Sequence, residues 1–297
     1  MNNNDILQSF IFENVSVRGE IVRLDDSFQT IMLQHRYPPI IQRILGEMLV
    51  AASLLSASIK FEGSITVQFQ GNKQMRLLLA QSNHRLELRG LAQWQGELTQ
   101  DEMLADLKQG TLVITMDSEE LGGQRYQGMI EWHGDSLAHS LEAYFTRSEQ
   151  VPTRLWLAVN EKRAAGLLIQ VIPDESGKAG NHLLMQDNWQ HIQHLSSTVT
   201  AEELLNLDTE TLLHRLYVEE DVRLFSARPV TFRCRCSNAR SENALRLLGE
   251  EEVEQELREK QVIVVTCEFC NKEYRFDRAD IARIFKNGDP NSSHQIH

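Results

Sequence analysis

The chain lacks cysteine over most of its length. Only four of its 297 residues are cysteines, and none lies among the first 233. The four then crowd into a short C-terminal segment, Cys234 and Cys236 in "TFRCRC" and Cys267 and Cys270 in "CEFC". Where thiols are kept reduced, such a cluster indicates a metal site or redox chemistry before a structural disulfide framework.

The sequence also lacks a targeting signal and a clear membrane span. Its start, "MNNNDILQSF", has no positively charged region followed by an apolar run, so we do not expect a secretory signal. The most apolar stretch, Ile40–Ile59, carries Arg43 and Glu47 and is better interpreted as a buried amphipathic helix. We therefore expect a cytoplasmic protein with no membrane partner.

Positive charge is in deficit. The chain has 30 lysines and arginines against 42 aspartates and glutamates, a formal net charge of −12. A nucleic acid would be repelled unless a local basic patch existed. Residues 233–286, around the cysteines, carry eleven basic and eleven acidic side chains and supply no such patch. We expect no nucleic-acid partner.

Signatures of catalysis are missing as well. "HGDSL" (133–137) contains an esterase-like Gly-Asp-Ser-Leu block, but no Asp-x-x-His follows, so Asp135 or Ser136 is expected to cap a helix instead. "ELGGQRYQG" lacks the Gly-x-Gly-x-x-Gly spacing and a P-loop lysine, and the chain has no His-Glu-x-x-His. We expect neither an enzyme nor catalytic residues, and no use of ATP.

The first part of the chain has mixed periodicity. A strand is expected over 15–24, then a helix capped by Asp25 or Ser27, and a long helix from about Pro39 to Ser58. Strands are expected in "GSITVQFQG", "QMRLLLAQS", "HRLELRGLAQW", "GTLVITM", "RYQGMIEW", "TRLWLAVN" and "AAGLLIQVIP", with a helix over 135–149. Six or seven successive strands with helices on one side predict an α+β layer rather than a doubly wound array.

Turn-forming residues at 173–181 indicate a domain boundary, and helices are expected beyond it. Thr200 and Glu203 form a capping box, and Asp208 caps a further short helix. Helices this short depend on packing against something else. After the first cysteine pair, a helix should begin at Ser237 and end at Gly249, with further helix over "EEEVEQELREK", followed by a strand, the "CEFC" turn, a strand and a closing helix.

The predicted organisation is α+β, with an N-terminal mixed layer domain, a helical linker and a small C-terminal metal-binding domain. We place an N-terminal core domain at 1–178, a helical linker at 179–231, the small metal-binding domain at 232–287 and a flexible tail at 288–297.

The cysteines form the pattern Cys-x-Cys, thirty residues, Cys-x-x-Cys. Four thiolates suffice for one tetrahedral zinc ion at about 2.3 Å per bond, with no open position for a substrate. On spacing alone a structural zinc site is favoured over a redox role, and iron or another thiophilic ion stays open. A zinc-ribbon adaptor and a Cys-x-x-Cys oxidoreductase are the competing functions; the charge disfavours the first and the C-terminal position of the motif the second.

The whole chain, with a mass of 34.1 kDa, resembles the bacterial thirty-three-kilodalton heat-shock protein family of redox-regulated chaperones. The specific motifs are "RCRCS" and "CEFCNKEYRF". The resemblance implies that Cys234, Cys236, Cys267 and Cys270 ligate one zinc ion in the reduced form. It also implies that oxidation links Cys234 to Cys236 and Cys267 to Cys270, the latter pair first, releases zinc and unfolds the C-terminal domain.

The resemblance further implies an ATP-independent holdase that is inactive when reduced and, when oxidised, dimerises and binds unfolding proteins under oxidative and heat stress. It assigns client binding and dimerisation to the core domain at 1–178, the redox switch to 232–287 and redox sensitivity to the linker at 179–231, which we expect to be the element that opens. The apolar residues expected to be uncovered are Leu183, Leu184, Trp189, Leu204, Leu205, Leu212 and Leu213.

Overall fold

The computed structural model describes residues 5–58, 62–97, 99–118, 123, 125–133, 136–172 and 182–286. They divide into two compact units, a first unit of Met1–Arg233 and a second unit of Cys234–His297. The predicted boundary at 173–181 and the predicted tail lie outside the described residues. The four domain ranges expected from the sequence stay predictions.

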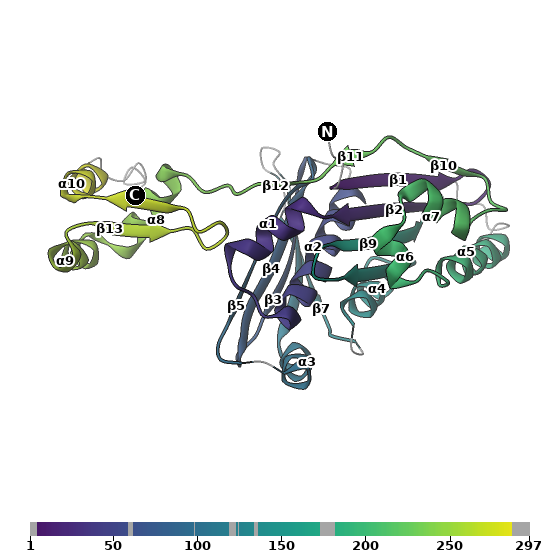
Figure 1. Ribbon diagram of the computed structural model, residues 1–297, viewed down its shortest axis with the longest axis horizontal. Helices are drawn as coiled ribbons and strands as arrows, with labels where there is room; N and C mark the ends of the chain where they lie inside the picture. The colour runs from purple at the N-terminus through teal and green to yellow at the C-terminus, as the bar shows by residue number, and fades with distance from the viewer. Residues whose placement is uncertain are drawn as a thin grey trace, which may run out of the picture. The chain divides into compact units, whose positions relative to one another are not determined.

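The strands of the first unit form two sheets (Figure 1). In the described residues, the first sheet has the order β10 (Val222–Leu224), β1 (Ile6–Phe12), β2 (Val17–Leu24), β9 (Ala164–Val171) and β8 (Thr153–Val159), and β11 (Arg228–Pro229) also pairs with β1. The second has the order β12 (Thr231–Phe232), β5 (Glu87–Trp94), β4 (Met75–Asn83), β3 (Gly63–Gln70), β6 (Thr111–Ser118) and β7 (Arg125–Ile130). All pairings are antiparallel except that of β12 with β5.

Helix α2 (Pro39–Ser58) lies between the two sheets (Figure 1). Thirteen of its 20 residues are buried. Both sheets approach it closely: a Cβ added to Gly90 of β5 would lie 2.9 Å from Leu49, and one added to Gly166 of β9 would lie 2.3 Å from Val50. A helix that is apolar around most of its surface must be covered on opposite sides. The expected single layer with helices on one side is therefore wrong, although the α+β class is confirmed.

By length and composition α2 is also the one described helix that could cross a membrane, yet 72% of its most apolar window is buried inside the protein. This burial agrees with the interpretation of Ile40–Ile59 as a core helix. Strand β1 and helix α3 (Gln100–Gln109) had no counterpart among the sequence predictions. The apolar residues of β1 do not alternate strictly, because both of its faces contact apolar neighbours.

Two predicted helix starts in the first unit have different outcomes. Ser136 caps α4 (Leu137–Arg147) by accepting the His139 N–H, as expected. Asp25 precedes α1 (Asp26–Gln34) but its side chain makes no capping bond. The carboxylate of Asp5 instead accepts the backbone N–H groups of Asp25 and Ser27, so a residue just before β1 and distant in sequence performs the capping.

Helices α5 (His182–Ser196), α6 (Ala201–Asn206) and α7 (Thr209–Leu216) cover the other face of the first sheet. Neighbouring sheet residues alternate between the two sides, with Leu168 in the α2 core and Leu167 under α5–α7. The capping box at Thr200 and the cap at Asp208 are confirmed. The apolar cluster under these helices comprises Phe10, Phe12, Val17, Ile21, Ala158, Ala165, Leu167, Ile169, Ile192, Leu204, Leu205, Leu212, Leu213, Leu216 and Tyr217.

Two arginine side chains, Arg23 and Arg163, form hydrogen bonds with carbonyl groups at the C-terminal end of α6. The guanidinium of Arg23 donates to the Leu207 carbonyl, and that of Arg163 donates to the Leu205 carbonyl at 3.0 Å. Carbonyls at a helix C-terminus lack intrahelical partners, and cations there are favourable. Asp25 holds Arg163 in place through an ion pair of 3.1 Å.

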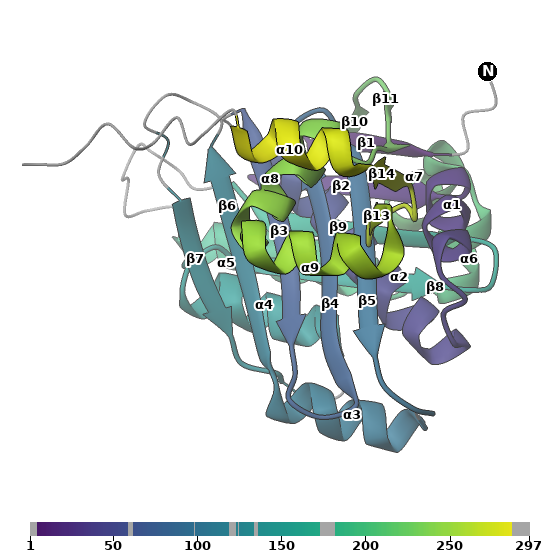
Figure 2. The same cartoon turned by 90° about the vertical axis from the view of Figure 1, so that its left-hand side faces the viewer.

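The second unit follows the predicted order of elements. It contains α8 (Asn238–Leu248), α9 (Glu250–Lys260), β13 (Ile263–Thr266), β14 (Glu273–Phe276) and α10 (Arg278–Lys286), which Figure 2 shows gathered together. Ser237 caps α8, and Gly249 ends it with a φ of 98°, both as predicted. Among the described residues, its apolar core comprises eight buried side chains: Leu245, Val253, Leu257, Ile263, Tyr274, Phe276, Ile281 and Ile284. So small a core stabilises a fold only weakly.

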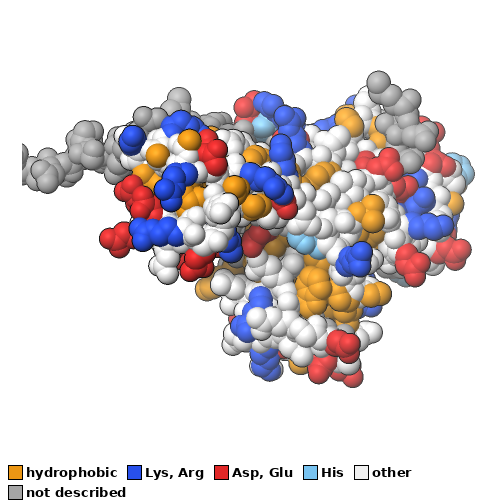
Figure 3. Space-filling model, turned by 60° about the vertical axis from the view of Figure 1, so that its left-hand side comes forward, with side chains coloured by type: hydrophobic (Ala, Val, Ile, Leu, Met, Phe, Trp, Pro, Cys, Tyr) orange, Lys and Arg blue, Asp and Glu red, His pale blue; other side chains and the backbone are white. Residues whose placement is uncertain are grey.

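Charged side chains of both signs are interspersed on the face seen in Figure 3. In the second unit, many pair with each other along helices, as do Arg258 with Glu254 and Lys260 with Glu256. The balance of basic and acidic residues counted at 233–286 therefore appears in the structure as ion pairs within this unit. The absence of a nucleic-acid partner stays a prediction.

We expect the free energy of unfolding to fall as the pH rises from about 5 to 7, because of Glu47 in α2. Burial raises the pKa of Glu47 to about 7 from an ordinary 4.5, and Arg43 offsets this only in part. The folded protein therefore keeps a proton that the unfolded chain has released. Glu47→Gln should remove this contribution and stabilise the protein by roughly 1–3 kcal/mol at pH 8. Denaturant titrations across this pH range measure the free energy of unfolding, with the exposed Glu97→Gln as the control. The same pH dependence of this free energy in the parent protein and in both variants would contradict the prediction.

We also expect Arg163→Gln to loosen α6 selectively. Losing a charged donor to the helix end should speed hydrogen exchange of the α6 amides about tenfold. Exchange in α2 should stay unchanged. The neighbouring exposed Lys162→Gln is the matched control, and exchange rates in α6 that are identical in both variants would contradict this role of the arginine.

Candidate metal centre

The four cysteines come from two loops of the second unit. Cys234 and Cys236 precede α8, and Cys267 and Cys270 lie in the turn between β13 and β14. That turn is closed by backbone hydrogen bonds from Cys267 N to Lys272 O at 3.0 Å and from Asn271 N to Cys267 O at 2.8 Å. Asn271 has a φ of 52°, a left-handed conformation that asparagine tolerates well. The predicted strand–turn–strand thus aims two sulfurs at one point.

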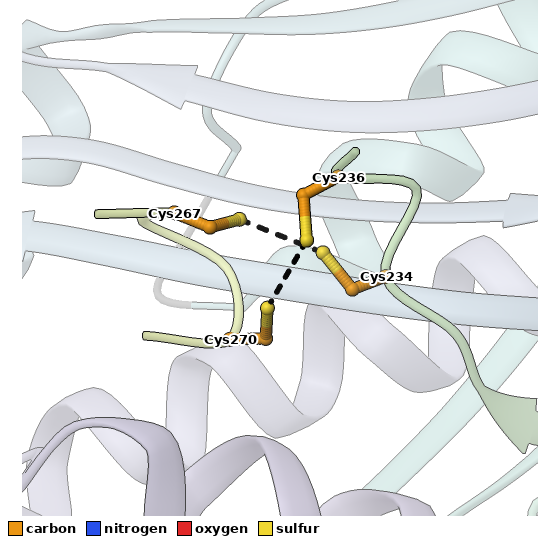
Figure 4. Close-up of side chains that lie close together, drawn as sticks. All are labelled: Cys234, Cys236, Cys267 and Cys270. Carbon is orange, nitrogen blue, oxygen red and sulfur yellow. Dashed lines mark hydrogen bonds between the residues drawn. The ribbon is translucent and has the colours of Figure 1, made fainter. Parts of the chain in front are cut away.

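The four side chains point toward one another (Figure 4). Their sulfurs all lie within 4.8 Å of one another, and the distances from Cys234 to Cys267 and from Cys236 to Cys270 are both 3.5 Å. Four sulfurs bound at about 2.3 Å to one tetrahedral ion lie about 3.8 Å apart. The spacing and the donor set therefore fit a single thiophilic ion, and they fit it without any histidine.

The sulfurs are half-buried. Their surroundings shift the thiol pKa values of Cys234, Cys236 and Cys270 in different directions. Burial raises the pKa of the Cys234 and Cys270 thiols. Burial acts in the same direction on Cys236, but hydrogen bonds from Tyr274 and from the other three thiols outweigh it and lower the pKa to about 7. Cys236 is therefore readily a thiolate at neutral pH, the form that binds metals and attacks oxidants.

Sequence reasoning missed Tyr274. Its hydroxyl donates to Cys236 Sγ at 3.1 Å, and the side chain is 8% exposed. The available signal was the alternation in "EYRF", where Tyr274 and Phe276 are buried and Glu273 and Arg275 are exposed. That pattern indicates an inward-facing ring, but the sulfur that its hydroxyl reaches comes from a distant segment.

The other candidate groups have ordinary roles. Ser136 is the cap of α4, so the esterase-like block is a helix start, as expected. The exposed His191 of α5 pairs with Glu220 at 2.8 Å and is not part of the cysteine cluster. The tail histidines, His294 and His297, lie outside the described residues.

Comparisons with known proteins cover nearly the whole chain. The family model described as Hsp33 protein matches residues 5–277. A 33 kDa chaperonin of Shewanella sp. (strain ANA-3) is 44% identical over 292 residues, which cover 98% of this chain and 99% of that protein. A 33 kDa chaperonin of Nitrosococcus oceani is 44% identical over 285 residues, 96% of each chain.

A solved structure is similar as well. The crystal structure of a 33 kDa chaperonin, a heat shock protein 33 homolog from Thermotoga maritima, superposes with a TM-score of 0.80 at 22% sequence identity. The match covers 96% of this chain and 99% of the other. At that identity the likeness establishes a shared fold.

We expect Cys267→Ser and Cys270→Ser to weaken metal retention strongly, because a hydroxyl is a poor ligand for a thiophilic ion. Protein purified under reducing conditions should carry one ion per chain, measured by elemental analysis, and each variant should carry much less after dialysis against a chelator. Thr266→Ser, which changes a neighbour of the turn, is the matched control. Full and tight metal binding by either cysteine variant would contradict the ligand assignment.

Proposed function

The chain belongs to the Hsp33 protein family, and from this premise we propose that it is a redox-regulated holdase chaperone that works without ATP. Membership confirms the resemblance carried by "RCRCS" and "CEFCNKEYRF". The names of the relatives support a chaperone function. The observation that carries the redox part of the proposal is the convergence of four sulfurs within 4.8 Å in a unit with a small core.

In the reduced protein, Cys234, Cys236, Cys267 and Cys270 would hold one zinc ion. The ion would supply a tetrahedral cross-link between the segment before α8 and the β13–β14 turn. Structural zinc contributes on the order of 10–16 kcal/mol in small domains, whereas whole domains have net stabilities of about 5–15 kcal/mol. The fold of the second unit would therefore depend on this cross-link.

Oxidation would convert the four thiolates to two disulfides. For each disulfide, two thiolates give up two electrons to one hydrogen peroxide, whose O–O bond breaks to form two waters with two protons taken from solution. We assign the pairs Cys234–Cys236 and Cys267–Cys270, because these neighbours stay close when the unit unfolds. The 3.5 Å contacts between the two motifs, Cys234 with Cys267 and Cys236 with Cys270, depend on the folded hairpin and would be lost on unfolding. A disulfide sulfur no longer binds zinc as a thiolate, so the second unit would unfold.

The segment 222–233 connects this event to the helices α5–α7. It runs from α7 along β1, with Val230 N bonded to Asp5 O at 3.0 Å, and then along β5, with Arg233 N bonded to Leu88 O at 2.9 Å. Short edge strands of two or three residues have few hydrogen bonds to hold them. When Cys234 loses its anchor, this segment and the short helices before it would separate from the sheet.

Separation would expose two apolar surfaces. Leu204, Leu205, Leu212 and Leu213 are buried against the first sheet, so solvent hardly reaches them in the closed form, and Trp189 is partly buried there. Their opposite surface includes Phe10, Ile21 and Leu167. The side chains of Leu183 and Leu184 lie outside the described residues. Unfolding proteins expose apolar segments that such surfaces bind.

The proposed setting is the bacterial cytoplasm, where thiols are reduced until stress occurs. The partners would be unfolded or partly folded proteins and, in the oxidised form, a second copy of the chain. Holding a client would require neither catalysis nor ATP hydrolysis.

A combined assay tests the function. Mild heat with peroxide should release one zinc per chain, seen with a chromophoric chelator, remove four free thiols and give the protein the ability to suppress aggregation of a denatured client. A thiol reductant should reverse the gain. Oxidised protein that never suppresses aggregation would overturn the proposal.

The opening of α5–α7 has its own measurement. Proteolysis within residues 182–216 should accelerate after peroxide treatment, while α2 stays protected inside its two sheets. Equal cleavage rates before and after treatment would show that these helices are not the element that opens.

A further inference from the structure

Tyr274 lies in the second unit at the centre of the β13–β14 hairpin, opposite Val265. Its ring is packed into the small core, and the ammonium of Lys272 lies 5.2 Å from the ring centroid. Its hydroxyl reaches out of this core to Cys236 Sγ at 3.1 Å. The hairpin thus carries both the Cys267–Cys270 turn and a side chain that contacts a sulfur of the other motif.

The direction of this hydrogen bond follows from the chemistry of the two groups. A metal-bound cysteine has no proton to donate, so the phenol O–H must be the donor and the sulfur the acceptor. Hydrogen bonds from outside the ligand set orient a ligand and tune its electron density. A donor on a thiolate withdraws density from the sulfur, which lowers its nucleophilicity toward electrophiles.

We propose that Tyr274 is a positioning residue that fixes the Cys236 sulfur toward the metal and slows the attack of that sulfur on oxidants. The inference rests on the proposed function, since it requires an ion held by the four cysteines. The reaction that it slows is the attack of the Cys236 thiolate on peroxide. The sulfur supplies two electrons, an S–O bond forms and the O–O bond breaks; the cysteine becomes a sulfenic acid, and the leaving hydroxide takes up a proton supplied by the solvent and departs as water.

The donor at Cys236 differs in kind from those at two of the other sulfurs. Cys234 receives the backbone N–H of Cys236, and Cys270 receives that of Lys272. Backbone donors belong to the turn itself and are present whatever the side chains are. The Tyr274 hydroxyl is a side-chain donor that substitution can remove, so its identity can set how much oxidant the switch requires.

Tyr274→Phe tests the proposal, because it keeps the ring, its packing and the contact with Lys272 while it removes the O–H. Tyr126→Phe is the matched control, since its hydroxyl bonds Glu149 in the first unit. Both variants and the parent protein are loaded with Co²⁺, whose thiolate-to-metal charge-transfer bands report electron density on sulfur. The bands of Tyr274→Phe should shift to longer wavelength, and those of Tyr126→Phe should match the parent.

A site-resolved measurement accompanies the spectra. In zinc-loaded protein, iodoacetamide labelling followed by peptide mass spectrometry should show Cys236 reacting about 3- to 10-fold faster in Tyr274→Phe, the range expected for the loss of one hydrogen bond. Labelling of Cys234 relative to Cys270 should not change. Peroxide should also release zinc from this variant at a lower concentration.

Two results would overturn the role of Tyr274. The first is an unchanged spectrum with unchanged Cys236 labelling. The second is an equal acceleration at all four cysteines, which would mean that the substitution merely loosens the fold. A parent protein that shows no charge-transfer bands at all would overturn the metal site itself and therefore the proposed function, an outcome that is distinguishable from both.

Discussion

The second unit depends on one constraint, that four sulfurs from two segments thirty residues apart meet at one point. Eight buried side chains form its core, too few to offset the entropy of ordering a chain of this length. A tetrathiolate ion would add a cross-link of the required strength. The same sulfurs are reactive as thiolates, so under the proposed function the group that would stabilise the unit would also be the group that an oxidant attacks.

In the first unit, the two faces of the first sheet are covered by different kinds of neighbour. One face packs against α2, which a second sheet covers from the other side. The other face packs against α5–α7, short helices of 6 to 15 residues held by apolar contacts and by Arg23 and Arg163. Local opening occurs where few contacts must break. The proposed function requires that α5–α7 separate from this sheet while its other face stays packed against α2, and the difference between the two covers agrees with that requirement.

Local patterns were predicted well wherever a residue acts on its near neighbours. The caps at Ser136, Thr200, Asp208 and Ser237 are all present. The predicted cap at Asp25 was wrong, because its carboxylate pairs with Arg163 and Asp5 takes its place. That replacement involves residues 20 positions and more apart, which no local pattern encodes.

The amino-acid sequence by itself determined the α+β class, the order of most elements, the clustering of four cysteines that could hold a metal ion, and the family. These depend on residue type and short spacing, which physical chemistry constrains directly. Tertiary structure alone decided that α2 is enclosed by two sheets, that α5–α7 cover the first sheet, and that Tyr274 donates to Cys236. These features arise when distant segments pack, and such packing is set by the shape of the whole chain.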